Sequence, residues 1–140
     1  MNLNYLLLFI GCLLFHPCKS HSQQTHRNLI YKADSCLYIN PSEGLSYAKE
    51  AIKGISESDE KYSQNLLLLA KLQRENRDLI NAEASILKGL HLNLNTTSKI
   101  DFLNELGIIY YLNGKRVESL LNLEKALKLA EELHLTDKIA

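Results

Sequence analysis

The sequence lacks an excess of charge of either sign. Lysine and arginine together number 16, aspartate and glutamate together also number 16, and the formal net charge is zero. Hydrophobic residues make up 46% of the chain, which is an ordinary share for a globular protein. This composition argues against a nucleic-acid-binding tail and against disorder, and the length of 140 residues predicts one domain.

The sequence also lacks convincing two-residue alternation of apolar and polar residues, which is the pattern of a half-buried strand. We therefore expect no strands and an all-α fold. The expected helices come in pairs, at residues 26–38 with 41–55, 59–76 with 79–92, and 99–112 with 115–133. Each pair forms a hairpin, so the three hairpins span about 26–55, 59–92 and 98–133.

Motifs for catalysis and for cofactor binding are lacking as well. The chain has no glycine-rich phosphate loop, no Gly-x-Ser-x-Gly elbow and no Ser-x-x-Lys motif. His26, His91 and His134 are far apart in the sequence, and none has a second metal ligand at helical spacing. We therefore expect a protein that is not an enzyme and that binds no metal and no cofactor.

The first residues have the character of a secretory signal. Residues 5–15 form an unbroken run of low polarity, which is shorter than the roughly 20 residues that a membrane-spanning helix needs. The small-x-small triplet Ser20-His21-Ser22 follows and predicts cleavage before Gln23. We therefore expect a signal peptide at 1–22, a helical domain at 23–140, export to the periplasm or the exterior, and no stable membrane span after cleavage.

Two other interpretations of this segment stay open. Residues 5–15 also fit a buried first helix of the domain, and Phe9-Ile-Gly-Cys12 loosely resembles the cleavage motif of a lipoprotein signal. Removal of the signal takes away Cys12 and Cys18, so the remaining Cys36 has no partner for an internal disulfide. Cys36 is in register with apolar positions of the first helix, and we expect a buried packing thiol there.

Residues 103–127 carry a joint pattern of apolar, small and turn residues. The pattern consists of Leu103, Leu106-Gly107, Tyr110, Gly114, Ser119, Leu123 and Ala126-Leu127. It resembles a tetratricopeptide (TPR) repeat, in which two antiparallel helices form one repeat. Leu103, Ser119 and Leu123 replace the family's usual Trp, Ala and aromatic residue. The resemblance implies a TPR-like solenoid of about three hairpins, of the exported bacterial type.

The residues of this stretch also have roles in helix packing and in the turn. Gly107 and Ser119 are small where two helices have to cross closely, and Gly114 allows the positive φ with which one helix stops and the next folds back. Ser98 and Asp101 are spaced as a capping box, which predicts the start of the preceding helix. On the last helix, Leu120, Leu127, Leu129 and Leu133 leave apolar surface to be covered.

The pattern recurs earlier in the chain. A shift of 37 residues places the TPR-like positions on Leu69-Ala70, Ala82, Ile86 and Gly89-Leu90, and a further copy is visible in Gly44, Ala48 and Ala51-Ile52. Arg77 stands in the place of Gly114, so that turn has to form without glycine, with Asp78 as the cap. Asn40 and Pro41 predict the start of the helix that follows them. Residues 136–140 resemble the start at Ser98 and predict the beginning of a further helix.

In TPR proteins the first helices of successive repeats line a concave groove that takes an extended or helical peptide. The resemblance implies nine groove residues here: Arg27, Asp34, Gln64, Lys71, Arg74, Asp101, Asn104, Ile108 and Tyr111. Lys71 and Arg74 are three residues apart on one helix face and are suited to a peptide carboxylate. The simpler alternative is that both are ordinary solvated charges.

The expected function is that of a non-catalytic protein–protein interaction module with a protein or peptide partner and no nucleic acid. The alternative is the extracytoplasmic sensory N-terminal region of a longer histidine kinase or transcriptional regulator. A signal that leads directly into TPR-like units resembles that layout, and the start of a further helix at residues 136–140 supports it.

Overall fold

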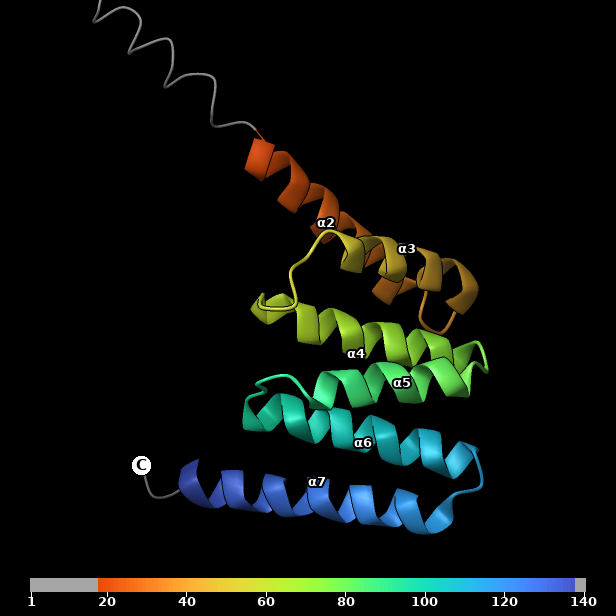
Figure 1. Cartoon of the computed structure of the whole chain (residues 1–140), viewed down its shortest axis with the longest axis vertical. Helices are drawn as coiled ribbons and strands as arrows, with labels where there is room; N and C mark the ends of the chain where they lie inside the picture. Colours follow the sequence, from red (N-terminus) through yellow and green to blue (C-terminus); the bar gives the residue numbers. More distant parts are fainter. Residues whose placement is uncertain (1–17, 138–140) are drawn as a thin grey trace, which may run out of the picture.

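The computed structural model describes residues 18–137, and they confirm the all-α class, with no strand in that range. The helices are α2 (Cys18–Ser35), α3 (Pro41–Lys53), α4 (Glu60–Glu75), α5 (Leu79–Leu90), α6 (Thr96–Leu112) and α7 (Arg116–Asp137). They follow one another along the long axis in chain order (Figure 1). Each helix contacts the next, and α4 also contacts α2 and α6.

The structure describes only the end of the predicted signal peptide, because residues 1–17 lie outside its range. Helix α2 begins at Cys18 and continues past Gln23 without a break at the predicted cleavage point. It therefore starts earlier than the helix expected at residue 26. No described helix combines the length and the apolar character that crossing a bilayer requires.

Polar side chains at the helix starts explain most of the boundaries. As predicted, the Asn40 side chain accepts from the N–H of Glu43, Pro41 occupies the first turn of α3, and the Asp78 side chain accepts from the N–H of Asn81. Each of these caps satisfies an N–H group that has no partner within its helix.

The start predicted for α6 is wrong. The side chain of Asn95 accepts from the N–H of Ser98 at 2.8 Å, so Asn95 is the N-cap and α6 begins at Thr96. Ser98 and Asp101 lie inside the helix and form no capping box at its end. Asparagine ranks at least as high as serine as an N-cap, and the earlier cap adds a turn to the helix.

The two later hairpins turn in the same way. Arg77 has φ of +62° and Gly114 has φ of +77°, the left-handed conformation that ends many helices. The N–H of Asp78 donates to the carbonyl of Gln73, and the N–H of Lys115 donates to that of Tyr110, both at 2.9 Å. These bonds and positive φ values form a Schellman motif at positions 37 residues apart. The predicted glycine-free turn therefore has the geometry of the glycine turn.

The last described helix is longer than expected. Helix α7 continues to Asp137, so residues 136 and 137 extend it where the sequence suggested the start of a further helix. Residues 138–140 lie outside the described range. No proline or glycine occurs between Arg116 and Asp137, and nothing in that stretch stops the helix earlier.

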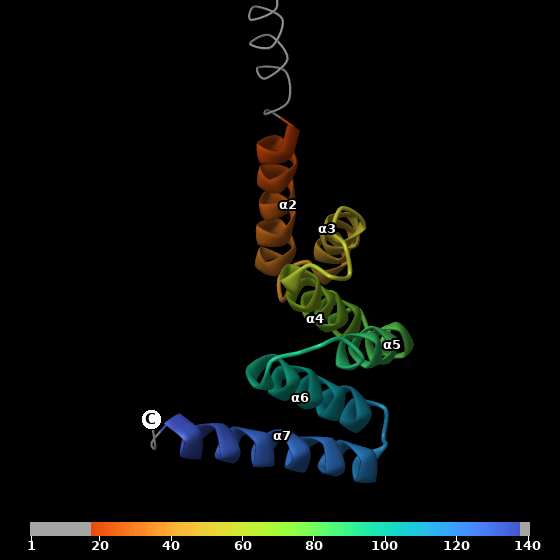
Figure 2. The ribbon, with the colours of Figure 1, turned by 60° about the vertical axis from the view of Figure 1, so that its left-hand side comes forward.

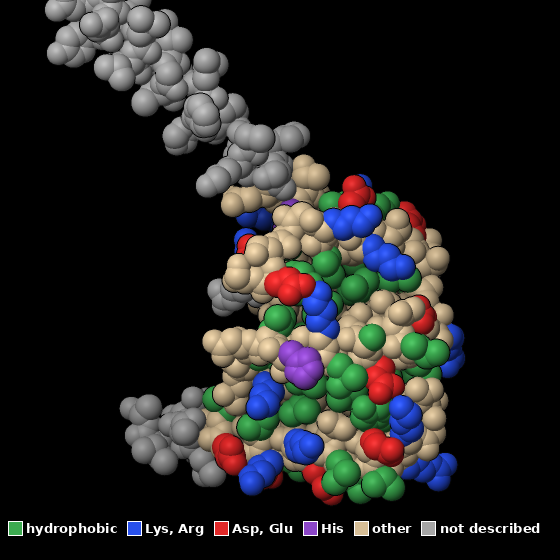
Figure 3. Space-filling view, in the orientation of Figure 1, with side chains coloured by type: hydrophobic (Ala, Val, Ile, Leu, Met, Phe, Trp, Pro, Cys, Tyr) green, Lys and Arg blue, Asp and Glu red, His purple; other side chains and the backbone are tan. Residues whose placement is uncertain are grey.

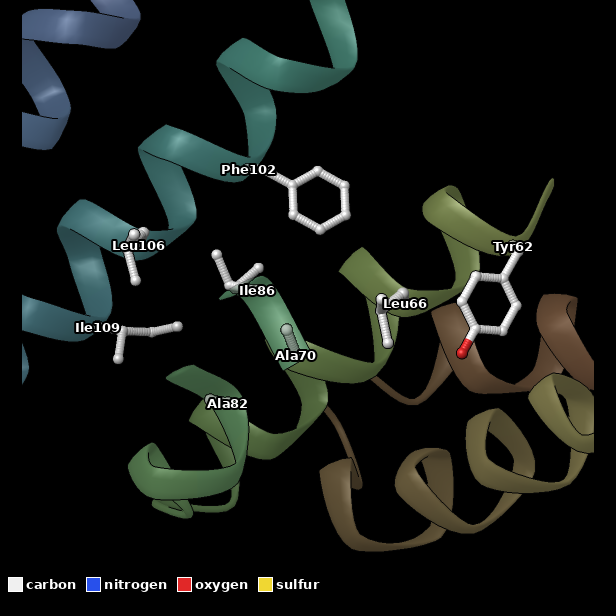
Figure 4. Close-up of a cluster of buried hydrophobic side chains, with 8 residues drawn as sticks. All are labelled: Tyr62, Leu66, Ala70, Ala82, Ile86, Phe102, Leu106 and Ile109. Carbon is white, nitrogen blue, oxygen red and sulfur yellow. The ribbon is translucent and has the colours of Figure 1, made fainter. Parts of the chain in front are cut away.

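Among the described residues, buried side chains form two clusters. The larger one joins α4, α5 and α6 and contains Tyr62, Leu66, Ala70, Ala82, Ile86, Phe102, Leu106 and Ile109 (Figure 4). The smaller one joins α2, α3 and α4 and contains Ala33, Leu37, Ala48, Leu68 and Leu72. Cys36 follows the last residue of α2 and is only half-buried, although the sequence predicted a buried thiol.

Gly89 and Gly107 lie where helices approach closely. A Cβ atom added to Gly89 would lie 1.8 Å from Cε1 of Phe102, and one added to Gly107 would lie 2.7 Å from the side chain of Leu123. Ser119 is also buried, and its carbonyl oxygen would lie 3.4 Å from the same added atom on Gly107. The small residues at the α6–α7 crossing therefore have the steric role that the sequence assigned to them.

Candidate functional site

The nine predicted groove residues all lie on α2, α4 and α6. These helices run along one side of the stack, and α3 and α5 lie on the other (Figure 2). Seven of the nine side chains are exposed, and the remaining two, Lys71 and Arg74, are partly buried. The largest apolar contribution comes from Tyr111 and Ile108, which are 65% and 40% exposed. Exposed side chains from all three helices are therefore present among the nine predicted residues.

Arg74 forms ion pairs with two carboxylates of its own chain. Its Nε lies 2.5 Å from Oε1 of Glu105, and its Nη1 lies 2.5 Å from Oε1 of Glu75. Burial lowers the pKa of the Arg74 guanidinium, but the hydrogen bonds and charges of Glu105 and Glu75 together outweigh burial and raise that pKa above its usual range. Arg74 thus connects α4 to α6, and its donors are largely occupied by this ion pair.

Glu105 is the partner that the sequence did not reveal. Its side chain is only 4% exposed, and it lies 31 positions from Arg74 in the chain. A buried carboxylate is costly unless it is paired and hydrogen-bonded, so Arg74 and Glu105 depend on each other. The only sequence signal was a Glu between the apolar residues Leu103 and Leu106.

Lys71 is in a different situation from Arg74. Its side chain is partly exposed on α4, and none of the ion pairs within residues 18–137 involves it. Its ammonium group is a mobile cation on a flexible stem and is free to pair with an incoming carboxylate. Of the two cations predicted to meet a peptide, Lys71 is therefore the better placed.

Two clefts lie beside Gln64. The larger one, of about 630 Å³, lies between α2, the end of α3 and the start of α4, and its lining includes Arg27 and Gln64. The smaller one, of about 370 Å³, lies between the start of α4 and the loop before α6. The volume of the larger cleft is in the range of small-molecule sites in proteins.

Charges on the visible face are mixed. Lysine and arginine side chains alternate there with aspartate and glutamate, and neither sign forms one large patch (Figure 3). Within the part of the chain that the structure describes, no group of three or more His, Cys, Asp or Glu side chains is arranged to hold a metal ion. The accessible surface thus offers apolar side chains and single charges.

Comparison of this chain with protein-family models, with curated proteins and with solved structures finds no match, so its function has to be inferred from its own residues.

Proposed function

We propose that this chain is a TPR-like, non-catalytic interaction module that binds an extended peptide or a partner helix along α2, α4 and α6. The observation that carries the proposal is the accessible row of side chains along three helices that share one side of the stack. Repeated hairpins create such a row because each hairpin adds one helix to the same side.

The repeat organisation is supported by the two Schellman turns. They lie at positions 77 and 114, at the spacing that the sequence pattern predicted. Small or apolar residues also recur at the helix crossings, where Ala82 and Ser119 are buried in α5 and α7, as is Gly44 in α3. The solenoid that we propose has three hairpins, α2–α3, α4–α5 and α6–α7.

The test of the proposal is charge reversal at Lys71. Peptides are first selected from a displayed library of random linear sequences against the purified chain. Peptides with a carboxylate are expected to bind Lys71→Glu at least about tenfold more weakly than the wild type, which is about 1.4 kcal/mol. Arg74 is left unchanged because a carboxylate there would repel the buried Glu105.

Lys49→Glu is the matched control, since Lys49 is an exposed lysine on α3, which lies on the other side of the stack from α2, α4 and α6. This variant should bind the selected peptides as the wild type does, and both variants should keep the wild-type thermal midpoint in circular dichroism. Equal peptide affinity of Lys71→Glu and the wild type would contradict the proposed surface.

Export through a signal peptide at residues 1–22 is part of the proposal. Its support is the sequence pattern of residues 5–22, most of which lies outside the described range. Amino-terminal sequencing of the protein from its own cells should begin at Gln23. A native protein that begins at Met1 would rule out the cleaved signal.

A further inference from the structure

The larger cleft beside Gln64 combines an apolar lining with one buried polar atom that has no hydrogen-bond partner. Leu29 and Ile30 of α2 line it together with Ala51 and Ile55 from the other wall. Ala51 is 2% exposed, and the other three are partly buried. Binding is favoured when the apolar part of a ligand replaces the water that covers such a surface.

The polar wall of the cleft holds a buried nitrogen with no partner. The amide nitrogen of Asn65 lies 3.3 Å from Nε2 of His26, and Asn65 itself is buried. If Nε2 accepts from this amide, the ring proton is on Nδ1. Nδ1 is buried and has no hydrogen-bond partner among the described residues. Buried N–H groups are normally hydrogen-bonded, and a carbonyl oxygen that enters the cleft beside His26 would supply the missing acceptor if the ring turned toward it.

The charges around the cleft balance. Arg27 and Lys61 contribute two cations, and Glu50 and Asp59 contribute two carboxylates. Asp59 already accepts from the N–H of Lys61 as the cap of α4. A rim of this composition matches a neutral ligand better than one of high charge, since a charged ligand would be opposed by one half of the rim.

We propose that this cleft is the anchoring subsite of the peptide surface, where it takes a large aliphatic side chain of the bound peptide and a neighbouring main-chain carbonyl. The inference rests on the proposed function, because Arg27 and Gln64 belong to both the cleft and the α2–α4–α6 row. An uncharged apolar residue with its two peptide groups fits the apolar lining, the unpartnered ring nitrogen and the balanced rim.

The probe is N-acetyl-leucinamide, which is one leucine side chain between two peptide groups. Titration into the full chain, followed by ¹H–¹⁵N NMR, should shift the side-chain amide signals of Asn65 and Gln64 and should saturate with a Kd on the order of millimolar. N-acetyl-glycinamide, which lacks the side chain, should bind at least about tenfold more weakly. Shifts that do not saturate, or equal affinities for the two probes, would overturn the inference.

Gly54 allows the cleft to be blocked without disturbing the core. It is exposed beside the cleft, and an added Cβ would meet nothing closer than the carbonyl oxygen of Ala51 at 3.8 Å. Gly54→Trp should therefore abolish binding of N-acetyl-leucinamide, whereas Gly54→Ala should retain it. Unchanged probe binding by Gly54→Trp would place the ligand elsewhere and overturn the subsite.

The same variants separate the subsite from the proposed function. If the wild type fails to bind N-acetyl-leucinamide while Lys71→Glu still weakens the selected peptides, the subsite is wrong and the peptide surface stands. If the probe binds and Gly54→Trp blocks it while Lys71→Glu changes nothing, the subsite stands and the peptide surface is wrong.

Discussion

Helices α5 and α7 carry the same apolar positions in different surroundings. Ile86 and Leu123 are 37 residues apart, and each follows its own Schellman turn at the same distance, yet Ile86 is 0% exposed and Leu123 is 38% exposed. Leu127, which corresponds to the partly buried Leu90, is 60% exposed. The difference is that α6 covers α5, whereas no described helix covers the outer side of α7.

This comparison teaches that the apolar pattern selects a helix face but does not bury it. The face of α5 is buried because Phe102, Leu106 and Ile109 of α6 pack on it. The matching positions on α7 leave Leu123 and Leu127 exposed by 38% and 60%. In stacked hairpins each unit contacts only its neighbours, so burial at one position depends on the next element.

The largest expected difference in stability is between variants of Gly89, where α5 meets α6, and Gly107, where α6 meets α7. Gly89→Leu forces its side chain against Phe102, which is 1% exposed and enclosed, and should cost more than about 3 kcal/mol or prevent folding. Gly107→Leu meets Leu123, which is partly exposed and has room to move, and should cost about 1–3 kcal/mol. Urea unfolding followed by circular dichroism measures both. A larger loss of unfolding free energy for Gly107→Leu than for Gly89→Leu would contradict the difference in burial between α5 and α7.

A smaller difference is expected for truncation of the two matched side chains. Ile86→Ala removes a fully buried side chain and should lower the free energy of unfolding by about 2–5 kcal/mol. Leu123→Ala should lower it by only about 1–2 kcal/mol, because water already reaches part of Leu123. If the two variants lose equal stability in thermal and urea unfolding, Leu123 is covered in solution by something that the described residues do not include.

The smallest effects are expected at the two turns, and they should have opposite signs. Arg77→Gly removes the backbone strain of a residue that carries a side chain in the left-handed conformation, and it should stabilise the protein by about 0.5–1 kcal/mol. Gly114→Ala forces a residue with a Cβ into that left-handed conformation and should destabilise the protein by about 1 kcal/mol. The urea midpoints report both signs. A destabilised Arg77→Gly would show that the Arg77 side chain contributes more than its backbone strain costs.

Local chemistry made much of the fold predictable from the sequence. The helix order, the caps at Asn40 and Asp78, the reversal at Gly114 and the small crossing residue Gly107 each follow from interactions between residues close in the sequence or from a recurring pattern. The start of α6 was missed because Asn95 and Ser98 are both good caps, and sequence alone favoured the one with a carboxylate three residues later.

The candidate site was less predictable, because its interactions connect distant residues. The sequence placed Arg74 on the expected helix but gave no sign that Glu105, 31 positions away, occupies its guanidinium. The cleft depends on the packing of α2 against α3 and α4, and the contact between His26 and Asn65 spans 39 positions. Such contacts follow from helix packing and have no signature in spacing or composition.

The most direct test of the proposed peptide surface uses the exposed apolar residues of α7 as the competing site. A peptide selected against the chain is titrated into the ¹⁵N-labelled protein, and the shifted backbone amides are mapped. The proposed function predicts shifts along α2, α4 and α6, centred on Gln64, Lys71 and Ile108. Shifts confined to the outer side of α7, around Val117, Leu120 and Leu127, would contradict it.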